Sequence, residues 1–249
     1  MNPQTPVEAR EIFSALKRIA KDFKKTELVI CPPFIYLPIL LTFNFKLSNL
    51  KIGAQDVFWE NPQANKGAFT GEISSEMLKN LGVTHIILGH SERRTMGETD
   101  EMVNKKIKAS LRSKLTPILC VGEKKRDTDG RFFEFLKNQI KSAFSKIKKA
   151  DLSKVIIAYE PIWAIGKSEK EYMRGEELYQ MVIFIRKTLS DIYGKKEVWK
   201  PKIIYGGSVT AFNISDIVFQ GQVDGILPGR ASLNPKEMKE IMKILETAR

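Results

Sequence analysis

Short apolar segments rich in Ile, Val and Leu alternate with longer amphipathic segments along nearly the whole chain. Seven of the short segments have the length and β-branched content of buried strands. They span residues 27–31, 51–55, 85–88, 117–121, 155–159, 202–205 and 225–227. Strands that alternate with helices form a parallel sheet covered by helices, so this pattern predicts an α/β fold.

The segments between the strands have the apolar spacing of helices. They span residues 7–23, 36–43, 74–81, 100–113, 131–147, 174–192, 213–219 and 235–247. A closed barrel and an open, doubly wound sheet both fit this order, but no Gly-x-Gly-x-x-Gly turn follows the first strand, which favours the barrel. No linker rich in Pro, Gly or Ser divides the 249 residues. We therefore predict a single TIM (β/α)8-type barrel domain over residues 1–249.

Composition and charge argue against several classes of protein. No apolar run reaches the roughly 18–20 residues of a membrane span, and the first ten residues lack the apolar core of a signal peptide. We expect a cytoplasmic protein with no membrane partner. The 41 Lys and Arg outnumber the 29 Asp and Glu by 12, but they are scattered and accompany no nucleic-acid motif. A positively charged surface favours an anionic substrate. Because no nucleic-acid motif accompanies the charges, we expect no nucleic-acid partner.

Two cysteines, Cys31 and Cys120, lie in predicted strands. Two buried thiols in a chain of this length are typical of a reducing compartment and do not make a disulfide scaffold or a zinc site. We expect no metal site.

Polar residues follow two of the predicted strands, at the edge of the sheet where barrel proteins carry their function. His90, one of only two histidines, comes soon after the strand 85–88. A short helix starting after it would favour the neutral imidazole, which donates a hydrogen bond to a carbonyl oxygen. Glu160 directly follows the strand 155–159, and removal of water there makes a carboxylate a better proton acceptor. The alternatives are a structural His90 and a Glu160 paired with Arg93.

Glycine-rich turns follow the last two predicted strands. Ser208 comes after Gly206-Gly207, and Gly229-Arg230 comes after Pro228. Glycine lets backbone N–H groups approach an anion, and the last two strands of a barrel commonly bind phosphate. Arg230 either adds a cation to that site or points to solvent. Trp163 and Ile165, beyond Glu160, could form an apolar lid. The inventory suits proton abstraction next to a carbonyl on a small phosphorylated sugar.

Four motifs resemble the triosephosphate isomerase family over nearly the whole chain, from about Ala9 to the C-terminus. They are Gly-Ala-Phe-Thr-Gly-Glu-Ile-Ser at 67–74, Ile-Leu-Gly-His-Ser-Glu-Arg-Arg at 87–94, Ala-Tyr-Glu-Pro-Ile-Trp-Ala-Ile-Gly at 158–166 and Tyr-Gly-Gly-Ser-Val at 205–209. The resemblance implies interconversion of dihydroxyacetone phosphate and glyceraldehyde 3-phosphate, in glycolysis and gluconeogenesis, without a cofactor.

The resemblance also implies roles for individual residues. Glu160 matches the catalytic base, His90 the electrophile and Glu92 a supporting carboxylate. Gly166, Ser208 and Gly229 match backbone ligands of the substrate phosphate, with Arg230 beside them, and the lid comprises Trp163, Ala164, Ile165 and Lys167. A homodimer is expected through the loop from Val57 to Thr70, which looks a few residues longer than usual here.

The sequence departs from the family pattern in three places. The lid reads Gly166-Lys167-Ser168-Glu169-Lys170 instead of Gly-Thr-Gly-Lys-Thr, and Gly229-Arg230 replaces a Gly-Gly pair. The third departure is the largest, because the family's first strand ends in Asn-Trp-Lys-Met-Asn and Met1-Asn2 matches only its last two residues.

The 249 residues therefore begin with a helix and carry seven strands, without the family's active-site Asn and Lys. We expect an open seam, or a substitute segment such as residues 1–5 or a partner chain in its place. We also expect weak or undetectable isomerase activity for this form. The alternatives are a non-catalytic barrel homologue that binds a ligand or partner, and another phosphosugar isomerase.

Overall fold

The computed structural model describes residues 2–42, 47–61, 67–166 and 172–248. Its described strands form one parallel sheet in chain order, β1-β2-β3-β4-β5-β6-β7. They are β1 (Leu28–Ile30), β2 (Leu50–Ala54), β3 (His85–Leu88), β4 (Thr116–Val121), β5 (Ile156–Tyr159), β6 (Lys202–Tyr205) and β7 (Gly225–Ile226). All seven coincide with predicted strands to within about two residues at each end, which confirms the parallel barrel-type sheet.

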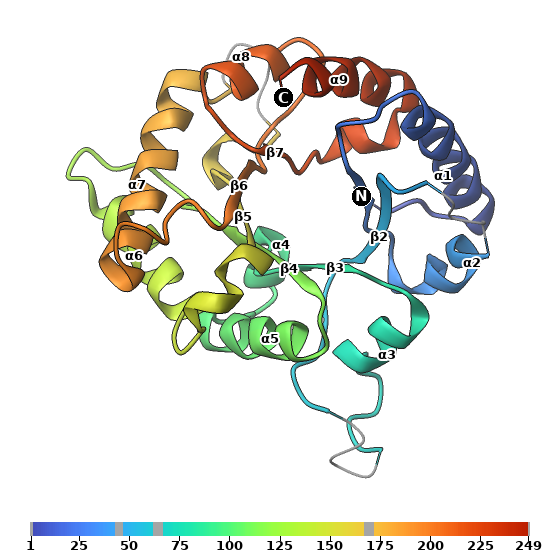
Figure 1. Cartoon of the computed structure of the whole chain (residues 1–249), viewed down its shortest axis with the longest axis horizontal. Coiled ribbons are helices and arrows are strands. Elements are labelled where there is room, and N and C mark those ends of the chain that lie inside the picture. Colours follow the sequence, from blue (N-terminus) through green and yellow to red (C-terminus); the bar gives the residue numbers. More distant parts are fainter. Residues whose placement is uncertain (1, 43–46, 62–66, 167–171, 249) are drawn as a thin grey trace.

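The described helices are α1 (Pro6–Lys21), α2 (Leu37–Leu41), α3 (Ser75–Leu81), α4 (Ser91–Thr95), α5 (Asp100–Arg112), α6 (Arg131–Ala143), α7 (Gly175–Tyr193), α8 (Ile214–Phe219) and α9 (Pro235–Thr247). All but the short α4 surround the strands as a ring in Figure 1. Short 3-10 turns η1 (Phe34–Tyr36), η2 (Lys149–Lys154), η3 (Ile162–Ala164) and η4 (Arg230–Leu233) complete the described elements. Most helix ends in the structure lie within two residues of the ends predicted from the sequence. The exception is α6, which ends four residues early because the chain turns through a left-handed Lys146 (φ 60°).

Local signals in the sequence explain where the first and last helices begin. The Thr5 side chain accepts a hydrogen bond from the Glu8 N–H and caps α1, and Pro6 occupies its first turn. Asn234 caps α9 in the same way, directly before Pro235. These two helices lie side by side in the ring (Figure 1) and are the first and last of the chain.

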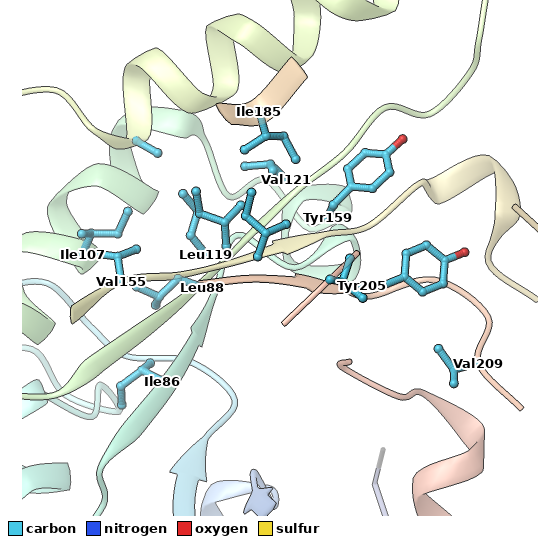
Figure 2. Close-up of a cluster of buried hydrophobic side chains, with 14 of the residues drawn as sticks. Ile86, Leu88, Ile107, Leu119, Val121, Val155, Tyr159, Ile185, Tyr205 and Val209 are labelled. Atoms are coloured by element: carbon cyan, nitrogen blue, oxygen red, sulfur yellow. The ribbon is translucent and has the colours of Figure 1, made fainter. Parts of the chain in front are cut away.

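The largest hydrophobic core lies between the outer face of the strands and the helices. Figure 2 shows Ile86, Leu119 and Val155 among the aliphatic side chains of this layer, with Ile107 of α5 and Ile185 of α7. The opposite face of the strands lines the barrel interior, where a second, smaller cluster is built on Ile118, Cys120 and Ala158. Successive side chains of a strand point to opposite faces of the sheet. Each strand therefore contributes to both apolar layers, the one against the helices and the one inside the barrel.

The sheet does not close among the described residues. β1 and β7 are its two ends and are not paired with each other, as the seven-strand count predicted. Residues 2–5 form no strand between β1 and β7. The hypothesis that this segment takes the place of a barrel strand is therefore wrong. Pro3 accepts a hydrogen bond from the Tyr36 hydroxyl, and Asn2 accepts one from the Gln55 side chain. These contacts hold the segment near the carboxyl ends of β1 and β2.

The helix ring stays closed across the seam because α9 is tied to the start of β1. The Glu246 carboxylate accepts hydrogen bonds from the backbone N–H groups of Lys24, Lys25 and Thr26. The Lys25 N–H is the largest of the contacts that lower the pKa of Glu246, to about 2.

We expect Glu246→Gln to lower the thermal unfolding midpoint by a few degrees at pH 7. A carboxyl with a lowered pKa contributes stability that is complete above its unfolded pKa of about 4.5 and is lost as pH falls toward 2. The difference from the parent should therefore shrink between these pH values. Calorimetry across this range measures it, with Glu240→Gln on the exposed face of α9 as control. A pH-independent difference would contradict the assignment.

Candidate active site

Glu160 lies directly after β5, and its side chain is almost completely buried (3% exposed). Its backbone N–H continues the ladder by donating to the Val121 carbonyl. One carboxylate oxygen accepts a hydrogen bond from the Ser91 N–H and the other from the Ser91 hydroxyl, each at 3.0 Å. The second oxygen also lies 3.0 Å from His90 Nε2. A buried carboxylate is thus held by donors that come from the end of β3.

His90 stands at the start of the short helix α4, as the sequence predicted. Its Nδ1 accepts a hydrogen bond from the Glu92 N–H at 3.3 Å, so that nitrogen carries no proton in this arrangement. The proton of the ring then sits on Nε2 and points at Glu160. The same N–H would serve as donor to a substrate carbonyl if Glu160 turned away.

The pKa of His90 reflects two opposing influences. Burial, the largest single one, lowers it, but the hydrogen bond to Glu160 and the charges of Glu160 and Glu92 together raise it above the usual 6.5. We expected a neutral His90 imidazole because the ring lies at the start of a helix. In this arrangement the contact with Glu160 instead favours the protonated imidazole. The neutral form regains its advantage when that contact is broken.

The two histidines of the chain provide a direct test. We expect the NMR titration of His90 to have a midpoint above 6.5 in the parent and below it in Glu160→Gln, where burial is no longer outweighed. His85, whose pKa is lowered first by burial, should titrate below 6.5 in both proteins and serves as the internal control. An unchanged His90 midpoint in Glu160→Gln would show that another group sets the charge of the ring.

The charged residues Glu92 and Arg93, which follow His90 closely in the chain, contact different groups. Glu92 is exposed, and its carboxylate lies 3.9 Å from His90 Nδ1, next to the site as the resemblance implied. Arg93 pairs at 2.7 Å with Asp56 and not with Glu160. The alternative of a Glu160–Arg93 pair is therefore wrong.

A buried charge network under the His90 turn was not predicted. Lys106 Nζ contacts the carboxylates of Asp56 and Glu98, and Glu98 also accepts the Gly89 N–H. Asp56 in turn joins Arg93. Lys106 is 3% exposed, although it lies in the charged run Asn-Lys-Lys that is typical of a solvated helix face. This network fixes the chain on both sides of His90.

The lid residues begin at η3. The Trp163 indole N–H donates to Glu123 at 2.8 Å, and Glu123 also accepts hydrogen bonds from Tyr159 and Arg126. Ala164 is fully buried and Ile165 is 42% exposed. Lys167 lies outside the described residues. Sequence reasoning missed Glu123, whose only signal was its place soon after the strand 117–121.

The glycine-rich turns do come together. The Ser208 hydroxyl accepts the Gly166 N–H at 3.0 Å and donates to the Ala164 carbonyl. A Cβ on Gly166 would lie 3.8 Å from Arg230 Nη2. Arg230 is thus close to Gly166 but also exposed to solvent, and its role as a cation at the phosphate site stays a prediction. Gly229 precedes it at the start of η4, and a Cβ on Gly229 would meet no atom within 4 Å.

Fold and site together define an α/β-barrel protein with a carboxylate–imidazole pair at the carboxyl ends of its strands. Comparison with known proteins specifies it further: the model of the family "Triosephosphate isomerase" matches residues 1–245. The chain belongs to the triosephosphate isomerase family. No described helix is long and apolar enough to cross a membrane.

Curated relatives agree with this assignment. The triosephosphate isomerase of Dictyoglomus thermophilum is 40% identical over 242 residues, which cover 96% of this chain and 94% of the relative. That of Thermoanaerobacter pseudethanolicus is 42% identical over 240 residues, with the same coverage. That of Clostridium botulinum strain Okra is 40% identical over 241 residues, again with the same coverage.

Proposed function

We propose that the chain interconverts dihydroxyacetone phosphate and glyceraldehyde 3-phosphate by proton transfer through an enediolate. The observation that carries this proposal is the buried Glu160 carboxylate 3.0 Å from His90 Nε2, at the carboxyl ends of β5 and β3. Family membership supports the same reaction. The isomerase motifs weigh against another phosphosugar isomerase.

In the proposed reaction Glu160 first leaves Ser91 and His90 and turns to the substrate. Its carboxylate removes a proton from the carbon next to the carbonyl, and the electron pair moves onto the carbonyl oxygen. His90 Nε2–H donates a hydrogen bond to that oxygen and stabilises the enediolate, while the Glu92 N–H donates to Nδ1 and the Glu92 carboxylate lies beside the ring. Glu160 then returns the proton to the neighbouring carbon. The hydroxyl proton moves between the two oxygens, so the product is an isomer.

The substrate phosphate is proposed to bind where Gly166, Ser208, Gly229 and Arg230 meet. The Gly166 N–H, which donates to the Ser208 hydroxyl in the described arrangement, would turn to the phosphate, and Arg230 supplies a charge of the correct sign. The lid of Trp163, Ala164, Ile165 and Lys167 would cover the site and exclude water. In the described arrangement Trp163 is held by Glu123.

We further propose that the 249-residue form is a weak enzyme. The family's first strand carries an Asn and a Lys that help to build the site, and the printed residues do not include that strand. The open seam between β1 and β7 is consistent with this. The second candidate function is a non-catalytic barrel homologue that retains ligand binding or an interaction role.

A coupled assay with purified protein separates the two candidates. We expect weak turnover of glyceraldehyde 3-phosphate, and competitive inhibition of that turnover by inorganic phosphate. Calorimetry provides the second measurement. Binding of phosphate without any turnover supports the non-catalytic candidate, and neither binding nor turnover contradicts both.

We also propose a cytoplasmic homodimer formed through the loop from Val57 to Thr70. The described parts of the segment between β2 and α3, residues 55–61 and 67–74, project from the barrel (Figure 1). Its described ends carry a cluster of aromatic rings, with Phe58 4.5 Å from Trp59 and 4.9 Å from Phe69 between ring centroids. A projecting aromatic segment suits docking onto a second copy. Analytical ultracentrifugation of the parent and Phe69→Glu tests it, with a shift toward monomer expected in the variant.

A further inference from the structure

A hollow of about 410 Å³ lies between α7, on the outside of the barrel (Figure 1), and the turn of residues 194–201 that leads into β6. Its lining includes the exposed apolar side chains of Tyr179, Ile183 and Trp199 and the cations Arg186, Lys187 and Lys195. No carboxylate is among the described residues that line it. The turn lies at the amino end of β6, whereas Glu160 and His90 lie at the carboxyl ends of their strands. The hollow is therefore separate from the candidate active site.

Trp199 is 76% exposed, more than any other large hydrophobic side chain in the described part of the chain. Its ring is nevertheless supported, because Arg186 Cζ lies 5.1 Å from the ring centroid. The Arg186 guanidinium donates to the carbonyl oxygens of Val198 and Pro201, on both sides of Trp199 in the chain, and lies 3.5 Å from Asp224. The indole is thus presented to solvent by a fixed support, which lowers the entropic cost of binding to it.

Two further apolar side chains of the hollow lie along one face of α7. Tyr179 and Ile183 are four residues apart, so they are neighbours on the helix surface, and both are exposed. Trp199 lines the same hollow from the turn. Exposed apolar side chains that gather at one place with a polar rim are typical of an interaction site, and Trp, Tyr and Arg dominate the binding energy of such sites.

The segments around the hollow are rich in lysine. Residues 144–155, before β5, and residues 194–202, at the start of β6, together contain eight Lys against two Asp or Glu, a net charge of +6 out of +12 for the whole chain. The two segments are neighbours, because the Tyr193 hydroxyl lies 3.0 Å from the carbonyl oxygens of both Phe144 and Ile147. Lysines that are far apart in the sequence are thus brought together by the fold.

Several of these lysines are available to a partner. Four of them are exposed and form no ion pair with a described carboxylate: Lys146, Lys148, Lys195 and Lys196. An acidic partner would gain contacts with them without displacing an internal pair. The same charge disfavours a second copy of the chain, because that copy also carries +12.

The apolar lining of the hollow selects among anionic partners. Val182 and Val198 line it together with the aromatic rings, and such a surface suits an apolar side chain better than the polar edges of a nucleic-acid base. A lipid surface is flat and does not enter a hollow. The volume lies within the range of about 300–1,000 Å³ that is usual for binding pockets. An acidic peptide segment with one large apolar side chain matches both the lining and the surrounding charge.

From these observations we propose that the hollow between α7 and residues 194–201 binds an acidic segment of a partner protein. One aromatic side chain of that segment would pack against Trp199, and its carboxylates would contact the surrounding lysines. Binding there leaves the carboxyl ends of the strands open. The proposal concerns an interaction alone and does not rest on the isomerase activity.

The probe is a fluorescently labelled synthetic peptide with one Phe between two runs of Glu, titrated with the whole 249-residue chain. We expect saturable binding by fluorescence anisotropy, which weakens as salt is added because exposed charges are screened. In NMR spectra the indole N–H signal of Trp199 should shift, whereas that of Trp163, which is bonded to Glu123, should not. Peptides with Gln in place of Glu, or with Ser in place of Phe, should each bind about tenfold more weakly.

Variants of the chain locate the site. Trp199→Ala should weaken binding of the Phe peptide by about tenfold, and Trp199→Phe, which keeps an aromatic ring, should retain most of it. Lys195→Glu should weaken binding by about fivefold. Lys236→Glu, at an exposed position in the first turn of α9, makes the same change in net charge and should have little effect. Thermal denaturation confirms that each variant is folded.

Several results would overturn the proposal. One is the absence of saturable binding, and another is equal binding by the parent, Trp199→Ala and Lys195→Glu. Tighter Trp199-dependent binding of a thymidine oligonucleotide, or of vesicles of phosphatidylserine and phosphatidylcholine, would assign the surface to a nucleic acid or a membrane instead. Self-association of the parent that is lost in Trp199→Ala would identify a second copy as the occupant, and would also overturn it.

Discussion

Glu160→Gln is expected to lower kcat/KM for glyceraldehyde 3-phosphate by about 10³- to 10⁴-fold, because a positioned general base contributes rate factors of this order. The amide has almost the shape of the carboxylate, so Ser91 and His90 still find a partner and the fold should persist. A coupled assay measures the rate, and circular dichroism confirms the fold. Glu101→Gln, at an exposed carboxylate of α5, is the matched control.

His90→Asn should produce a loss of similar order through a different cause. It removes the Nε2–H donor that the enediolate oxygen requires but leaves Glu160 in place. If either variant keeps the parent rate, the corresponding role is wrong. If both lose the rate and also unfold, thermal denaturation will reveal it, and Ser91→Ala then offers a milder change at the same carboxylate.

Extension of the chain is expected to have the second large effect. A strand ending in Asn-Trp-Lys, fused ahead of Met1, should raise kcat/KM about a thousandfold. A lysine ammonium about 4 Å from the reacting charges contributes roughly 4 kcal/mol at an effective dielectric of 20, and each 1.36 kcal/mol is tenfold in rate. The strand should also fill the seam and raise the thermal midpoint.

A matched extension with Met in place of that Lys separates the two effects. It should raise the thermal midpoint as much as the lysine form but recover only a small part of the rate. Equal rates for the two extensions would mean that barrel closure, and not the cation, limits the enzyme. A high rate for the unextended chain would mean that another cation, such as Arg230, acts in its place.

The sequence was most informative where a residue's role depends on its own segment. The bounds of β3, β6 and α9 follow from local periodicity and capping, and they agree with the structure to the residue. His90 and Glu160 could be found because Glu160 directly follows an apolar strand and His90 lies two residues beyond the end of another. A common site for the two residues also follows, since β3 and β5 share the same edge of the sheet, but their 3.0 Å contact is a finding of the structure, because β4 lies between these two strands.

Partnerships between distant segments could not be derived in this way. Glu123 lies in a run of Lys and Arg that is typical of a solvated loop, yet it is 1% exposed and holds Trp163, Tyr159 and Arg126. Lys106 is likewise buried against Asp56 and Glu98. Such contacts depend on which side chains neighbouring elements bring together, and no local pattern contains that information.

Solvent deuterium provides the most direct test of proton transfer by a carboxylate. The reaction of glyceraldehyde 3-phosphate should be followed by NMR in deuterated water with the parent or, for speed, the lysine-extended chain. We predict that part of the dihydroxyacetone phosphate formed carries deuterium on the carbon that received the proton, because a proton held by Glu160 exchanges with solvent. Glu160→Gln should abolish both product and label. Turnover with no deuterium in the product, or no turnover by the extended chain, would contradict the account.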